Sequence, residues 1–131
     1  MIRKWFGTVL LALVGLVLLN TSGCARDQKL VSINLSPADG FVFAGPGAAG
    51  QFTAYGNYIH PPESKDISTQ VTWTLNIKNF GTVSSDGLVT YTRADGCGFG
   101  QVTATFNNSD GSVITATAPV SGANSANASC Q

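Results

Sequence analysis

The sequence predicts an all-β sandwich of about seven or eight short antiparallel strands. After residue 24, apolar and polar residues alternate with a period of two, as in half-buried strands. No segment of this part keeps the 3.6-residue apolar period of a helix. Asp-Gly pairs and prolines interrupt the alternation at the short intervals typical of sandwiches. A small closed barrel is the structural alternative.

Five longer runs and three shorter ones are expected to form the strands. The longer runs are Leu30–Ser36, Gln51–Tyr58, Val71–Leu75, Gly100–Phe106 and Val113–Val120. The shorter runs are Phe41–Phe43, Thr82–Ser84 and Leu88–Tyr91. The residues expected to face the core are Val31, Ile33, Leu35, Phe52, Ala54, Tyr58, Val71, Trp73, Leu75, Val102, Ala104, Phe106, Ile114, Ala116, Ala118 and Val120.

Turns are expected at four Asp-Gly pairs, because glycine adopts positive φ without a steric penalty. They are Asp39-Gly40, Asp86-Gly87, Asp95-Gly96 and Asp110-Gly111. Residues 30–120 then form one domain, preceded by a short tether at 24–29. The small polar residues of 121–131 predict a flexible tail.

The N-terminus has the layout of an export signal. A basic start, Met1–Lys4, precedes the uncharged apolar run Trp5–Leu19. Thr21-Ser22-Gly23-Cys24 resembles the lipobox of bacterial lipoproteins, which are cut before a cysteine that carries diacylglycerol. We therefore expect a signal peptide at 1–23 and lipid on Cys24. Plain secretion and a retained membrane anchor are the alternatives, although about 15 apolar residues fall short of the roughly 20 that span a bilayer.

This signal predicts a lipid-anchored protein of the cell envelope. Ala25 follows the cysteine in place of the aspartate that retains lipoproteins in the inner membrane of enteric bacteria, which favours the outer membrane in a two-membrane source. The chain has seven Lys+Arg and seven Asp+Glu residues. This balance excludes a basic nucleic-acid binder.

The ordered runs resemble the bacterial immunoglobulin-like group 2 (BIG2) family. The pieces that match are Val31–Ile33 with Ser36-Pro37, Gly50–Ala54, Val71–Thr74, Gly81–Ser84, Asp86–Thr90 and Gly100–Thr105. The resemblance implies an immunoglobulin-like sandwich that serves as a spacer or binding module, often in adhesins, and it implies no catalytic residues. A single module, the long stretch after Gly56 and two extra cysteines depart from the family pattern.

Those cysteines, Cys97 and Cys130, are expected to form a disulfide, because exported proteins meet oxidising conditions. A reactive thiol or a metal ligand is the alternative. One histidine cannot complete a zinc site with them, so no metal is predicted.

The sequence predicts no enzyme and no cofactor. His60 is the single histidine and Glu63 the single glutamate, while most aspartates precede a turn glycine. A catalytic triad, paired catalytic carboxylates and calcium at the Asp-Gly turns are the alternatives, and none has a supporting motif. No glycine-rich nucleotide loop follows a strand.

Binding is therefore the expected function, with an envelope protein or a surface glycan as partner. The candidate binding loop is 57–69, with Tyr58, His60, Glu63 and Lys65 as its candidate contacts. Tyr55 and Tyr58 could form an aromatic face for a glycan. The alternative is a structural or accessory subunit of an envelope complex with no soluble ligand.

Overall fold

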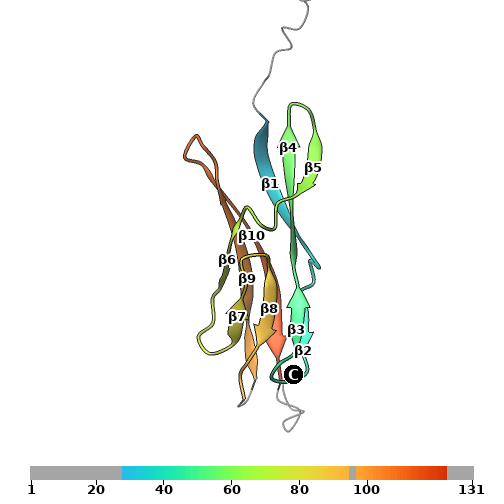
Figure 1. Ribbon diagram of the computed structural model, residues 1–131, viewed down its shortest axis with the longest axis vertical. Coiled ribbons are helices and arrows are strands. Elements are labelled where there is room, and N and C mark those ends of the chain that lie inside the picture. Colours follow the sequence, from blue (N-terminus) through green and yellow to red (C-terminus); the bar gives the residue numbers. More distant parts are fainter. Residues whose placement is uncertain (1–27, 95–96, 124–131) are drawn as a thin grey trace, which may run out of the picture.

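The computed structural model describes residues 28–94 and 97–123, which form ten strands (Figure 1). The strands are β1 Lys29–Ser36, β2 Phe41–Phe43, β3 Ala49–Gln51, β4 Thr53–Ile59, β5 Glu63–Asp66, β6 Thr72–Leu75, β7 Gly81–Val83, β8 Leu88–Tyr91, β9 Gly98–Asn107 and β10 Val113–Gly122. In these described ranges, no helix has the length and hydropathy needed to cross a membrane.

The strands build two facing layers. One layer is the four-stranded sheet β2-β10-β9-β6. The other combines the sheets β1-β4-β5 and β3-β8-β7, which meet where Phe52 separates β3 from β4. This strand order is that of an immunoglobulin-like sandwich. The all-β sandwich predicted from the sequence is confirmed, with ten strands and with one parallel pair, β2 with β10.

The core between the layers contains the residues that the alternation placed there in β6, β9 and β10. Trp73, Val102, Ala104, Ala118 and Val120 are all buried. Phe43, Phe80 and Tyr91 add an aromatic cluster, in which the Phe80 and Tyr91 rings lie edge to face with centroids 4.9 Å apart. The period-two pattern therefore predicted this part of the core.

Val31 is the main error in the predicted core, because its side chain is 46% exposed. The pairing of β1 with β4 shifts register between Leu30 and Ser32, which is a β-bulge. The bulge lets Leu30 and Ile33, three residues apart, both face the core. Strict alternation cannot anticipate such an inserted residue.

The segment 57–69 was predicted as a loop, and that prediction is wrong. β4 continues to Ile59, the chain turns at His60–Pro62, and β5 pairs back along β4. Ile67, just after β5, is fully buried in the core. The segment escaped prediction because β5 is the edge strand Glu63–Asp66, whose four residues are all exposed.

Three of the Asp-Gly turns lie in the described residues. Gly40, Gly87 and Gly111 have φ values of 76°, 93° and 83°, as these turns require. Asp95-Gly96 lies outside the described residues. β10 continues to Gly122, two residues beyond the predicted end of the domain, because Gly122 pairs with both Gly98 and Phe43.

Candidate functional site

One end of the sandwich gathers three segments that are distant in sequence (Figure 1). We call it the hairpin end and define it as Gln28–Lys29, the β4–β5 turn His60–Pro62 and the β9–β10 turn residues Asn108–Asp110. The pairing of Lys29 with Ile59 places the start of β1 beside the base of the β4–β5 turn. The described chain therefore begins at this end.

Gln28 is held by the β4–β5 hairpin. Its Nε2 donates to Glu63 Oε2 over 3.0 Å, and its Oε1 accepts from Lys65 Nζ over 2.8 Å. Lys65 Nζ also lies 3.0 Å from Glu63 Oε2 and 5.4 Å from the centroid of the Tyr58 ring. Three of the four predicted contacts, Tyr58, Glu63 and Lys65, therefore form one polar cluster around Gln28.

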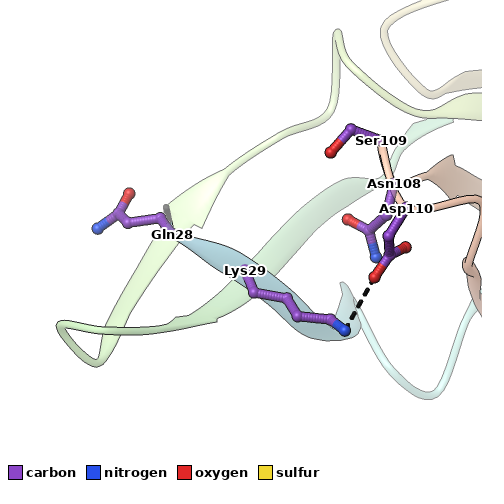
Figure 2. A pocket seen from close by; sticks show the side chains of 5 residues that line it. All are labelled: Gln28, Lys29, Asn108, Ser109 and Asp110. Carbon is purple, nitrogen blue, oxygen red and sulfur yellow. Dashed lines mark ion pairs between the residues drawn. The ribbon is translucent and has the colours of Figure 1, made fainter. Parts of the chain in front are cut away.

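Lys29 is directed to the other hairpin. Figure 2 shows its side chain reaching Asp110 while Gln28 points to the opposite side of the strand. Lys29 Nζ lies 2.9 Å from Asp110 Oδ2, across an open pocket of about 200 Å³ that Gln28, Asn108 and Ser109 also line. Because side chains alternate along an extended chain, Gln28, which precedes β1, and Lys29, the first residue of β1, contact two different hairpins.

The carboxylates of this region are stabilised in their charged form. Hydrogen bonds from Gln28 and then Lys65 lower the pKa of Glu63. Ser112 and then Lys29 hold the pKa of Asp110 well below its usual range. Hydrogen bonds from the Ser68 side chain and backbone lower the pKa of Asp66. A general acid needs a raised pKa, so these shifts run opposite to the one that acid catalysis requires.

His60 lies at the tip of the β4–β5 turn, exposed to solvent and with a φ of 64°. It does not belong to the Gln28 cluster. Tyr55 and Tyr58 are three residues apart on β4, so their side chains point to opposite faces of the sheet. Tyr55 is exposed, whereas Tyr58 packs against the core. The structure therefore does not form the aromatic face that was one alternative for glycan binding.

The predicted cysteine sites lie mostly outside the described residues. Cys24 and Cys130 are not among the described residues, so lipidation of Cys24 and the Cys97–Cys130 disulfide stay predictions. Cys97 is described, immediately before β9, where Gly98 pairs with Gly122 at the end of β10. Among residues 28–94 and 97–123, no three His, Cys, Asp or Glu side chains form a group that could hold a metal ion.

A scan against protein-family models and a search of curated proteins both find no match. The interpretation of the hairpin end therefore depends on its contacts and geometry alone. Sequence reasoning found Tyr58, Glu63 and Lys65 there but missed Gln28, Lys29 and Asp110. Nothing in the local sequence marks these three, because they meet their partners across 30 or more residues of chain.

Proposed function

We propose that this chain is a lipid-anchored, non-catalytic, immunoglobulin-like module of a bacterial cell envelope, which binds an envelope partner. The proposal rests on the lipobox-like sequence at Thr21–Cys24 and on a sandwich whose charged side chains at the hairpin end are paired with one another. One observation relates the proposed anchor to the proposed binding end. Gln28 is already fixed to Glu63 and Lys65, only four residues after Cys24.

This short connection determines which end of the domain would face the membrane. Four residues span at most about 14 Å when fully extended. Lipid on Cys24 therefore keeps the hairpin end close to the bilayer surface and directs the opposite end, with the β2–β3 turn, away from it (Figure 1). A partner of His60, Glu63 or Lys65 would then lie in the same membrane or at its surface.

A protein partner fits this end better than a glycan. Tyr55 and Tyr58 lie on opposite faces, so β4 offers no aromatic platform on which a sugar ring could stack. The exposed groups are instead a charged pair, Glu63 and Lys65, and the turn His60–Pro62. Such groups suit the polar rim of a protein interface.

The anchor is tested by the intact mass of protein extracted from membranes. The chain should lack residues 1–23 and carry acyl mass on Cys24, and Cys24→Ser should release it from the membrane fraction. A chain that begins at Met1 would contradict the proposal.

The binding end is tested by photocrosslinking in intact cells. A crosslinker at His60 should give adducts with a membrane protein, whereas one at the exposed Pro46, in the β2–β3 turn, should not. Adducts found only with the crosslinker at Pro46 would show that the binding surface lies at the opposite end of the domain. Single positions are used because replacing the whole segment 57–69 would also remove the buried residues Ile67 and Ser68 and so disturb the fold.

A further inference from the structure

The outward side of the four-stranded sheet is free of charge. We call it the threonine face and define it by the residues that alternate with the buried ones on β2, β10, β9 and β6. They are Val42, Thr72, Thr74, Phe99, Gln101, Thr103, Thr105, Asn107, Val113, Thr115, Thr117, Pro119 and Ser121. None of them is ionisable.

The threonines form a regular array. The pairing of β6 with β9 and of β9 with β10 aligns Thr72, Thr105 and Thr115 in one row across the sheet. The next row consists of Thr74, Thr103 and Thr117. Each hydroxyl can both donate and accept a hydrogen bond, so each can pair with another threonine as well as with water.

A row with two exposed apolar side chains lies at the end of the face away from the hairpins. Val42 pairs with Ser121, which pairs with Phe99, so the three lie side by side on neighbouring strands. Val42 is 84% exposed and Phe99 is 61% exposed, the two highest values among the described large hydrophobic residues. Val42 and Phe99 lie on either side of Ser121, so this row exposes two large apolar side chains close together.

We propose that the threonine face binds a second copy of this chain anchored in the same membrane. This inference rests on the proposed lipid anchor, because two anchored copies stand with the same end toward the bilayer. A two-fold axis parallel to the strands then brings each row against the same row of the partner, with threonines on threonines and Phe99 near Phe99. An isologous contact of this kind repels if its centre carries charge, and this face carries none.

The size of the face predicts a contact that depends on the membrane. Five rows about 6.7 Å apart on strands about 4.8 Å apart give roughly 400 Å² on each copy. The total is below the about 1,200 Å² of stable soluble complexes. Confinement to one membrane raises the effective concentration of the second copy, so association is expected there and not in dilute solution.

Charge-swap variants test the proposal directly. Full-length lipidated protein with donor or acceptor fluorescent proteins fused after Gln131 is placed in phospholipid vesicles, and energy transfer between copies is measured. The wild type should exceed the transfer of randomly distributed anchors. Thr117→Lys alone and Thr117→Glu alone should each weaken association at least about tenfold, because like charges meet at the interface. Mixing the two variants should restore it.

Thr82 provides the matched control, because it is an exposed strand threonine on β7 in the other layer. Thr82→Lys should associate like the wild type.

If circular dichroism shows that a Thr117 variant is unfolded, the Thr74→Lys and Thr74→Glu pair replaces it. Monomeric wild type in vesicles, or association that survives Thr117→Lys, overturns the inference, as does a monomer that instead binds a neutral glycan through this face. Vesicle flotation reports the anchor separately, so a protein that floats yet stays monomeric leaves the proposed function intact.

Discussion

Trp73 donates a hydrogen bond from its indole Nε1 to the backbone oxygen of Ser68 over 2.8 Å. Ser68 is itself buried, and its Oγ accepts from the backbone N–H of Ala54 over 2.9 Å and donates to Asp66 Oδ1 over 2.6 Å. The core tryptophan on β6 is thereby linked to the base of the β4–β5 hairpin. Stability of the core and the position of the hairpin are coupled through one serine.

Ser68→Ala is therefore expected to destabilise the domain. It leaves the buried Ala54 N–H without its acceptor, which costs about 1–3 kcal/mol of unfolding free energy. Urea unfolding followed by circular dichroism measures the change. Ser64→Ala, at an exposed position of β5, is the control and should stay within about 0.5 kcal/mol of the wild type. Equal losses for the two variants would contradict the role given to Ser68.

Stability should also fall in acid. The pKa of Asp66 is lowered in the folded protein, first by the side-chain and then by the backbone hydrogen bond of Ser68. Because the pKa of Asp66 is lower in the folded than in the unfolded protein, its carboxylate stabilises the fold at pH values above the unfolded-state pKa of about 3.9. This stabilisation is lost as the pH falls through the folded-state pKa. Asp66→Asn should therefore be less stable than wild type at pH 7, with the difference shrinking below about pH 4. The Ser68→Ala background should reduce this pH dependence, and an unchanged difference down to pH 2 would contradict the assignment.

Two glycine substitutions separate backbone strain from steric overlap. Gly40 and Gly111 both have positive φ. A Cβ on Gly40 would meet Pro119 O at 1.7 Å, whereas one on Gly111 meets nothing within 4 Å. Gly111→Ala should cost about 1–2 kcal/mol for its backbone conformation alone. Gly40→Ala should cost about 2 kcal/mol more, because β10 backbone cannot move aside easily. Equal thermal unfolding temperatures for the two variants would show that the turn relaxes.

The Cys97–Cys130 disulfide is predicted to stabilise natively exported protein. Cys97 lies beside the end of β10, and the seven residues 124–130 that follow Ala123 can span up to about 23 Å, so the connection is sterically reachable. Closing a loop of about 34 residues is worth roughly 3–4 kcal/mol in the chain-entropy model. Cys130→Ser should lose most of this, as measured by denaturant unfolding without reductant. Free thiols on both cysteines of the exported protein would contradict the pairing.

The sequence predicted those parts of the fold whose side chains repeat with a period of two. β6, β9 and β10 keep that period where they cross the core, and Trp73, Val102, Ala104, Ala118 and Val120 are buried as predicted. Toward the strand ends, the predicted core residues Leu75, Phe106, Ile114 and Ala116 are only partly buried. β1 breaks the period at Val31, where it has a β-bulge. This bulge arises from the pairing of β1 with β4 and not from the local sequence. β5 has no apolar residue at all, because it forms an exposed edge, so hydrophobic patterning cannot detect it.

The hairpin end was predicted in part for a similar reason. Tyr58, Glu63 and Lys65 stand out locally as an aromatic residue and charges in a proline-containing stretch. Their common partner Gln28 is an ordinary polar residue before the first strand, and the ion pair of Lys29 with Asp110 joins opposite parts of the chain. Such long-range polar contacts follow from the topology, which a single sequence does not display.

The first two strands, β1 and β2, belong to different layers, and this arrangement has a mechanical consequence. β1 pairs antiparallel with β4 in one layer, and β2 pairs parallel with β10 in the other. The start of β1 and the end of β10 lie at opposite ends of the molecule (Figure 1). A pulling force between an anchor at one end and a load at the other therefore runs along the strands and shears both ladders. The hydrogen bonds of each ladder would then have to break together, so we expect the domain to resist tension along its strands rather than to unzip.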